Sequence, residues 1–305
     1  MHPPNSSEIE ITTFFLIGMP GLEHAHVWIS VPICLMYLVA ILGNCTILFV
    51  IRTEPSLHAP MYHFLSMLAV SDLGLSFSSL PTMLRIFVFN AMGISPNACF
   101  AQEFFIHGFT DMESSVLLVM SFDRFLAIRN PLRYSSILTS ARVAKMGLVF
   151  LIKSMLTYCR KSLLSHSYCL HQDVRKLASC ASTRVNSLYG FIVLIFTLGL
   201  DALLILMSYV LILKTVLGIA SRSERLTTLS TCLSHMSAVF FFYVPFIGAS
   251  VIHRYGEHLS PVVHMLMANI YVLLPAVLNP IAYSVKTKQI RRRIIQVFQR
   301  RKNRV

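Results

Sequence analysis

Long apolar stretches, separated by short polar segments, fill most of the chain. A helix needs about 20 predominantly apolar residues to cross the hydrocarbon core of a bilayer, which is about 30 Å thick. Such a stretch satisfies its own backbone hydrogen bonds as a helix. The pattern therefore predicts membrane-spanning helices at Val27 to Ile51, Met61 to Leu80, Phe100 to Ile128, Leu188 to Leu217, Leu226 to Val251 and Val262 to Val285.

A seventh apolar stretch, Val143 to Leu156, is shorter. It has 14 residues and carries Lys145 and Lys153, so its length alone favours a re-entrant or interfacial segment. The distribution of positive charge favours seven crossings. With the amino terminus outside, seven crossings place 18 of the 26 lysines and arginines on the cytoplasmic side, including nine in residues 286–305. Six crossings place those nine outside, against the positive-inside rule.

The composition agrees with a membrane protein. Of the 305 residues, 55% are hydrophobic and 13% are charged, and the mean hydropathy is +0.66. A soluble fold of this size needs more charge on its surface. The formal net charge of +13 would suggest nucleic acid in a soluble protein, whereas in a membrane protein it records orientation. We therefore expect contact with membrane lipid and no nucleic acid partner.

Three regions follow from this topology: an extracellular amino terminus (1–26), a seven-transmembrane domain (27–285) and a basic cytoplasmic tail (286–305). The first residues lack the basic region, apolar stretch and cleavage site of a removable signal peptide, so the first span is expected to act as the signal. Asn5 begins an N-glycosylation acceptor pattern on the outer side.

The cysteines divide between the spans and the outer side. Cys34, Cys45 and Cys232 lie in spans or at an inner helix end, where a free thiol packs as a small hydrophobic group. The other four face an oxidising compartment and allow two disulfides in three pairings. They are Cys99, Cys159, Cys169 and Cys180.

Ordered motifs then narrow the class of protein. The strings at Gly43-Asn44, Leu68 to Leu73, Met120 to Ile128 and Asn279 to Tyr283 together resemble rhodopsin-like G-protein-coupled receptors. Those at Pro60 to Leu65, Ser208-Tyr209 and Ser230 to His235 are similar to olfactory receptors. Three more resemble the class I, or fish-like, branch: Phe105 to Phe109, Leu164 to Asp173 and Lys286 to Arg291.

This resemblance covers nearly the whole chain and implies an all-α, seven-transmembrane helix bundle of rhodopsin-like fold. It also implies the disulfides Cys99–Cys169 and Cys159–Cys180. The function that it implies is that of an odorant receptor in the plasma membrane, which binds a small volatile ligand between its helices and activates a stimulatory olfactory G protein.

The fourth span departs from the family pattern. From Lys153 to Cys159 the chain lacks roughly a dozen residues of the usual outer half, where a span needs about 20 in all. A helix from Lys145 to Thr157 rises only about 18 Å. Local thinning of the bilayer and snorkelling of Lys153 would allow insertion as a strained hairpin. The alternative is a receptor-like chain that misfolds in the endoplasmic reticulum and is disabled.

A switch at the cytoplasmic end is expected around Arg124. An arginine beside Asp123 can stay paired in one state and enter a cytoplasmic crevice in another; alternatively it is only a positive-inside anchor. The resemblance adds Tyr209, Asn279 and Tyr283 to the switch. Pro280 breaks the helical hydrogen-bond ladder and predicts a kink, which is either functional or structural.

Two acids in the middle of spans, Asp72 and Glu113, should face the interior and meet a cation, a proton or each other. The resemblance implies a sodium-type pocket there with Asn44 and Asn279 nearby, and no other cofactor or metal. Protonated carboxyls that only pack helices are the competing interpretation. For two further intramembrane acids, Asp111 and Asp201, the sequence indicates no partner.

The ligand site is expected where His107, Gln172, Ser250 and Arg254 converge on the outer side. Arginine matches a carboxylate with two parallel hydrogen bonds, although a terminal arginine alone more often snorkels to the interface. The resemblance of Val251 to Arg254 to the class I pattern implies instead that Arg254 binds an acidic ligand. Four apolar or aromatic side chains are expected to wall the chamber, unless they are simply core: Phe104, Ile205, Tyr243 and Phe246.

Enzymatic activity is not expected. The sequence has no zinc-ligand spacing, phosphate-binding loop or nucleophile elbow. A transporter is the rival from another class, and it would favour inverted repeats or paired broken spans. The sequence shows no internal repeat, so a receptor is the better interpretation.

Overall fold

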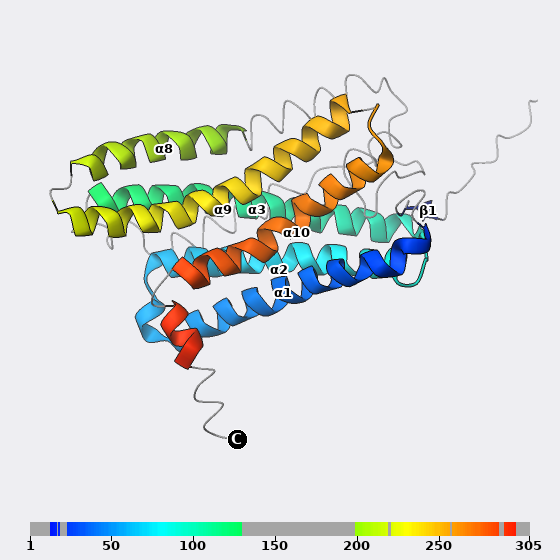
Figure 1. The fold of residues 1–305 in the computed structure, drawn as a ribbon, viewed down its shortest axis with the longest axis horizontal. Coiled ribbons are helices and arrows are strands. Elements are labelled where there is room, and N and C mark those ends of the chain that lie inside the picture. Colours follow the sequence, from blue (N-terminus) through cyan, green and yellow to red (C-terminus); the bar gives the residue numbers. More distant parts are fainter. Residues whose placement is uncertain are drawn as a thin grey trace, which may run out of the picture.

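The computed structural model describes residues 13–16, 18, 23–129, 199–218, 221–256, 258–286 and 290–296. Long helices run side by side along the longest axis of this part of the chain (Figure 1). Residues 290–296 form one further helical segment. The long helices are α1 (His26–Thr53), α2 (Pro60–Phe87), α3 (Pro96–Arg129), α8 (Leu200–Leu217), α9 (Arg222–Tyr255) and α10 (Pro261–Lys286).

The six long apolar stretches predicted as spans are confirmed as helices wherever the structure describes them. Five of these helices are long and apolar enough to cross a membrane. The exception is α3, because its 34 residues include Glu103, Asp111 and Glu113. The predicted seventh stretch and its shortening, at Val143 to Cys159, lie outside the described residues.

The ends of several helices follow from local sequence. Pro60, Pro96 and Pro261 occupy the first position of α2, α3 and α10, where the missing N–H of proline costs no hydrogen bond. The Ser221 side chain caps α9 by accepting a hydrogen bond from the backbone N–H of Glu224 at 3.5 Å, which satisfies one of the unpaired donors at a helix start.

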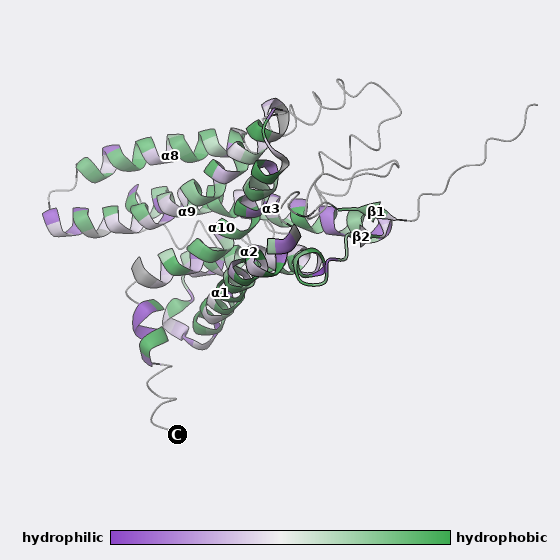
Figure 2. Cartoon of the chain, turned by 45° about the vertical axis from the view of Figure 1, so that its right-hand side comes forward, coloured by the Kyte–Doolittle hydropathy of each residue, from purple (hydrophilic) through white to green (hydrophobic). Residues whose placement is uncertain are grey.

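The arrangement of the helices places α3 at the centre. It packs against α2, α8 and α9, while α10 packs against α9, α1 and α2. Outward faces of α1 and α8 are strongly apolar (Figure 2), with large exposed side chains such as Trp28, Leu42 and Leu206. A bundle that is apolar outside as well as inside fits a lipid environment.

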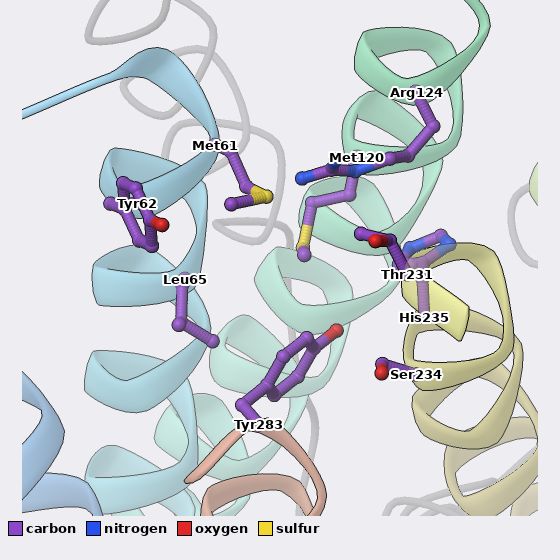
Figure 3. A pocket seen from close by; sticks show the side chains of 9 residues that line it. All are labelled: Met61, Tyr62, Leu65, Met120, Arg124, Thr231, Ser234, His235 and Tyr283. Atoms are coloured by element: carbon purple, nitrogen blue, oxygen red, sulfur yellow. The ribbon is translucent and has the colours of Figure 1, made fainter. Parts of the chain in front are cut away.

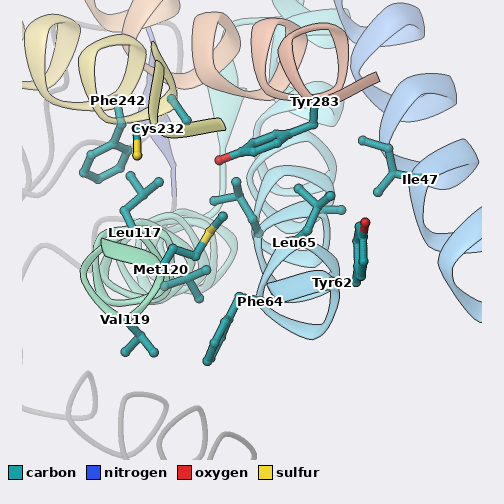
Figure 4. Close-up of a cluster of buried hydrophobic side chains, with 14 of the residues drawn as sticks. Ile47, Tyr62, Phe64, Leu65, Leu117, Val119, Met120, Cys232, Phe242 and Tyr283 are labelled. Atoms are coloured by element: carbon teal, nitrogen blue, oxygen red, sulfur yellow. The ribbon is translucent and has the colours of Figure 1, made fainter. Parts of the chain in front are cut away.

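Buried apolar side chains form two clusters at opposite ends of the bundle. The inner cluster joins α1, α2, α3, α8, α9 and α10 and includes Phe64, Leu117, Met120 and Phe242 (Figure 4). The outer cluster includes Tyr37, Met83 and Met265. The polar residues described below lie between and beside these two clusters.

A short antiparallel pair of strands closes the outer end of α1, α2 and α3. Strand β1 (Phe14–Phe15) pairs with β2 (Gly93–Ile94). Phe14 and Leu16 are each 2% exposed and belong to the outer cluster, and the Phe14 ring meets Phe100 edge to face. Part of the segment before α1 is therefore packed onto the bundle.

Candidate functional site

A crevice lies between α2, α3, α9 and α10, at the end of the bundle that the sequence predicts to face the cytoplasm (Figure 3). It encloses about 340 Å³, including the part that is open to solvent. Arg124 and Tyr283, both predicted switch residues, are in its wall. The other lining residues are Met61, Tyr62, Leu65, Met120, Thr231, Ser234 and His235.

Arg124 lies beside its predicted partner. Its Nε is 3.8 Å from Oδ2 of Asp123, and the Asp123 side chain is 2% exposed against 16% for Arg124. The carboxylate is thus on the buried side, while the guanidinium reaches the crevice (Figure 3). A cation placed this way is available to a group that enters the crevice.

Tyr209 of α8 is connected to the crevice by a contact with His235 of α9. Its hydroxyl is hydrogen-bonded to Nδ1 of His235, and the two rings stack with centroids 5.7 Å apart. Both side chains are buried. Tyr283 is also buried, and its hydroxyl has no hydrogen-bond partner among the described residues. Tyr209 therefore ties α8 to α9, and His235 is the residue that joins it to the crevice.

The intramembrane acids Asp72 and Glu113 meet in the middle of the bundle, and both are fully buried. The side-chain N–H groups of Asn279 donate to Oδ1 and Oδ2 of Asp72 at 3.3 and 3.2 Å, and to Oε1 of Glu113 at 3.3 Å. Three helices, α2, α3 and α10, thus share one polar centre, as the sequence led us to expect.

Asn44, by contrast, uses its amide for packing. Nδ2 donates to the backbone carbonyls of Ala40 and Ala276, each at 3.0 Å, which joins α1 to α10. A close contact lies beside it: a Cβ on Gly43 would come within 2.9 Å of the Cβ of Pro280. The structure therefore shows Asn44 as a link between α1 and α10.

Beside the acid pair, a polar connection joins α3, α8 and α9. The Ser114 hydroxyl donates to Oδ2 of Asp201 at 2.9 Å and lies 2.9 Å from the hydroxyl of Tyr243. One helical turn earlier, Thr110 of α3 is hydrogen-bonded to Tyr271 of α10. The partner that the sequence did not indicate for Asp201 is therefore Ser114.

The residues of the predicted outer chamber lie only partly within the described ranges. His107 and Phe104 of α3 are half-buried, and Ile205 of α8 is buried. Phe246 of α9 stacks on Phe242 and meets Tyr271 edge to face, at 6.1 and 5.4 Å between centroids.

Ser250 and Arg254 follow Phe246 along the same face of α9, at intervals of four residues. The Arg254 side chain and Gln172 lie outside the described residues, so their convergence with His107 stays a prediction.

Three buried polar residues were missed in the sequence. His235 belongs to the motif Ser230 to His235, which the sequence analysis used only to indicate the family. Glu103 is fully buried one turn before His107 and lies in a predicted span. An acid in an apolar stretch is the signal that indicates such a residue. Asn269 of α10 is 6% exposed, and its amide has no hydrogen-bond partner in the part of the chain that the structure describes.

Of the four cysteines in the predicted disulfides, the structure describes Cys99. Cys99 is fully buried and disulfide-bonded, whereas Cys34, Cys45 and Cys232 are free, as predicted. Cys159, Cys169 and Cys180, and the glycosylation site at Asn5, lie outside the described residues. Within the described ranges, no group of three or more His, Cys, Asp or Glu side chains is placed to hold a metal ion.

Comparison with solved structures identifies the fold. The chain resembles squid rhodopsin in its crystal structure, with a TM-score of 0.69 and 19% sequence identity over 93% of this chain and 90% of that one. The all-α bundle, with its polar centre and cytoplasmic crevice, is thus the seven-transmembrane, rhodopsin-like receptor fold.

Comparison of the sequence identifies the family. The family model described as olfactory receptor matches residues 33–301. Human olfactory receptor 51A4 is 63% identical over 310 aligned residues, which cover 98% of each chain. Human olfactory receptor 51A7 is 64% identical over 303, covering 95% of this chain and 96% of the relative. The chain belongs to the olfactory receptor family, and it is a multi-pass membrane receptor rather than an enzyme.

Proposed function

We propose that this olfactory receptor binds a small, acidic volatile ligand between the outer halves of its helices and activates a stimulatory olfactory G protein at its cytoplasmic crevice. We place it in the plasma membrane with its amino terminus outside. The ligand class and the type of G protein are the new parts of this proposal. They extend the receptor function that the family establishes.

The observation that carries the proposal is the position of α9. This one helix contributes Phe246 to the outer chamber, Tyr243 to the hydrogen bonds with Ser114, and His235 to the wall of the crevice. A ligand that shifts the outer part of α9 therefore acts on a helix that also lines the crevice beside Arg124. Two-state movement of such an element is a known way to couple distant sites.

The acidic ligand is proposed from the chemistry of the outer residues. Ser250 and Arg254 share the face of α9 that also carries Phe246, and His107 faces the chamber from α3 in the predicted arrangement. Arginine offers a planar fork to a carboxylate, and partial burial strengthens the pair. Apolar and aromatic walls suit the aliphatic part of a volatile acid.

The test compares an aliphatic acid with its methyl ester in cells that express the receptor, with cAMP as the readout. We expect the acid to activate and the ester to fail. In Arg254→Ala the acid response should weaken roughly 10- to 100-fold, because a hydrogen bond to a charged group contributes about 1.5 to 3 kcal/mol. Arg254→Lys keeps the charge without the fork, so its potency should fall between the two.

Tyr255→Ala is the matched control, because Tyr255 follows Arg254 directly and is 70% exposed. Its acid response should equal that of the unmodified receptor when surface levels are equal. If acid and ester are equally potent on the unmodified receptor, Arg254 is an interfacial anchor and the proposed ligand class is wrong.

A sodium ion at the acid pair is a further part of the proposal. Glu113 Oε2 and Asn279 Oδ1 are buried and have no hydrogen-bond partner in the described part of the chain, and they adjoin Asp72. Oxygen atoms of this kind are the ligands that hard cations prefer. We expect replacement of sodium by a bulky organic cation to change agonist potency, and Glu113→Gln to remove that dependence. Equal sodium dependence in both receptors would contradict this site.

Disulfides Cys99–Cys169 and Cys159–Cys180 complete the proposed outer structure. Burial and bonding of Cys99 support the first pair. Peptide mapping by mass spectrometry without reduction should recover both pairs, together with a glycan on Asn5. A peptide that joins Cys99 to Cys159 would contradict the pairing.

Loss of function through a short fourth span is the second candidate. The alignment with human olfactory receptor 51A4 extends over 310 positions, more than the 305 residues of this chain, so the relative carries residues that this chain lacks. We propose that they belong to the fourth span. Antibody staining of unpermeabilised cells distinguishes the two candidates, since a disabled chain stays inside the cell and a working receptor reaches the surface.

A further inference from the structure

Two histidines flank the start of α2, at the end of the bundle that carries the crevice. His58 directly follows the short 3-10 helix Pro55–Leu57 in the connection between α1 and α2, and His63 lies in the first turn of α2. The centroids of the two imidazole rings are 6.4 Å apart. His58 is exposed and His63 is half-buried, so both rings are accessible to a small solute.

A hydrogen bond orients the ring of His63. Its Nδ1 lies 3.2 Å from the backbone carbonyl oxygen of Ala59. A carbonyl oxygen can only accept, so Nδ1 carries a proton, and in the neutral ring Nε2 is then the nitrogen with a free lone pair. Histidines that bind metal commonly donate their other ring N–H to a backbone carbonyl in this way. His63 is therefore oriented as a metal ligand, and Ala59 supports it.

The separation of the two rings suits one shared ion. A zinc–nitrogen bond is about 2.0 to 2.1 Å long, so the ion lies about 3 Å from the centroid of an imidazole that binds it. Two imidazoles that share an ion then have centroids about 5 to 6 Å apart. The observed 6.4 Å between His58 and His63 differs from this by a small side-chain rotation.

We propose that His58 and His63 form a two-histidine binding site for a divalent transition-metal ion, with zinc as the ion that fits it. Imidazole suits zinc and copper, whereas magnesium and calcium prefer oxygen ligands. Within the described ranges no group of three or more His, Cys, Asp or Glu side chains is placed to hold a metal. Water therefore completes the coordination, and the ion exchanges with solution.

The position of the site gives the bound ion a consequence for the crevice. Met61 and Tyr62 lie between the two histidines in the sequence, and both line the crevice. An ion held by His58 and His63 joins the connection before α2 to the first turn of that helix, so it restrains this part of the crevice wall. A ligand that binds the folded protein stabilises it by mass action. Zinc should thus raise the thermal unfolding midpoint of the receptor without odorant or G protein.

The test counts the zinc ions bound by the purified full-length receptor, by competition with a fluorescent zinc chelator. His58→Gln and His63→Gln should each lower the affinity of this site at least about tenfold, because loss of either ligand removes the second, intramolecular attachment. Each single variant should therefore lose one bound zinc ion, and the double variant should lose no more than that one. Two separate sites would lose one ion in each single variant and two in the double variant, which would overturn the proposal.

His264→Gln is the matched control. The Nδ1 of His264 also lies near a backbone carbonyl four residues earlier, 3.3 Å from that of Ser260, but His264 stands near the start of α10, whereas the crevice lies near its end at Tyr283. This variant should bind as much zinc as the unmodified receptor. A loss equal to that of His58→Gln would contradict the pair.

A measurement on the unmodified receptor keeps the proposal testable if a variant fails to fold. At one zinc ion per receptor, X-ray absorption at the zinc edge should show two imidazole ligands, with oxygen in the remaining positions. Magnesium in large excess should not displace the zinc, because it prefers oxygen ligands. A spectrum with sulfur ligands, or with a single imidazole, would overturn the site, and so would displacement of the zinc by magnesium.

Discussion

Helices α1 and α3 differ in how many buried polar side chains join them to other helices. Along α1 the large exposed residues are apolar, among them Val31, Leu35 and Leu42, and Asn44 is the residue that ties this helix to α10. Along α3 the buried residues include many polar ones, and several meet a different helix: Gln102 meets α2, Thr110 and Glu113 meet α10, and Ser114 meets α8 and α9. The apolar helix faces lipid, and the polar helix organises the bundle.

This difference shows how to interpret a polar residue in a span. Asn44 joins α1 to one other helix, whereas the row of buried polar residues in α3 joins this helix to α2, α8, α9 and α10, because buried polar groups need hydrogen-bond partners. It follows that substitutions on α3 should have large effects and matched substitutions on α1 small ones.

The largest effect is expected at Arg124. Arg124→Ala should abolish ligand-stimulated cAMP at an unchanged surface level, because it removes the cation from the crevice wall. Arg129→Ala is the control on the same helix: Arg129 lies over the Phe125 ring at 5.7 Å and is not among the residues that line the crevice. Loss of surface protein in Arg124→Ala would instead make this residue a topological anchor.

A smaller effect, on stability, is expected at the acid pair. Asn279→Leu removes the donors to Asp72 and Glu113, and a buried polar group left without a partner costs about 1 to 3 kcal/mol. The thermal unfolding midpoint of the purified receptor should therefore fall by several degrees. Asn269→Leu is the control on the same helix. Its amide has no hydrogen-bond partner among the described residues, so the midpoint should hold or rise, and a fall equal to that of Asn279→Leu would contradict this account.

Substitution of one buried serine in each helix allows a direct comparison of α3 with α1. Ser114→Ala removes hydrogen bonds to α8 and α9, each of which contributes about 0.5 to 1.5 kcal/mol. Ser30 donates to the Val27 carbonyl of its own helix at 2.7 Å, so Ser30→Ala should change the free energy of unfolding by less than about 0.5 kcal/mol. Denaturation of both variants in the same detergent measures the difference, and equal changes would show that interhelical position does not matter.

The smallest effect is expected on the lipid-facing side of α1. Leu42 is 58% exposed, and lipid chains are as apolar as leucine, so Leu42→Ala should leave the unfolding midpoint in lipid nanodiscs within measurement error. A clear loss would mean that another protein surface, rather than lipid, covers this side of α1.

The sequence predicts the helices well because their length and apolar character are local properties. It also indicates the residues of the central polar site, since an acid inside a span is conspicuous. It does not predict the bond between Tyr209 and His235 or the bond between Ser114 and Asp201, because each depends on how two distant helices rotate and pack. The packing of Phe14 and Leu16 onto the bundle is missed for the same reason, since a two-residue strand carries too little pattern.

Opening of the crevice is the central claim, and Cys232 offers a direct measurement of it. This free thiol of α9 is 5% exposed and belongs to the apolar cluster beside the crevice, whereas the free thiols Cys34 and Cys45 lie on α1. Inside-out membrane vesicles are treated with a membrane-impermeant thiol reagent, and modification of each cysteine is followed by mass spectrometry. An acid that raises cAMP should accelerate the modification of Cys232 and leave Cys34 and Cys45 unchanged. An unchanged rate at Cys232 in the presence of such an agonist would contradict the account.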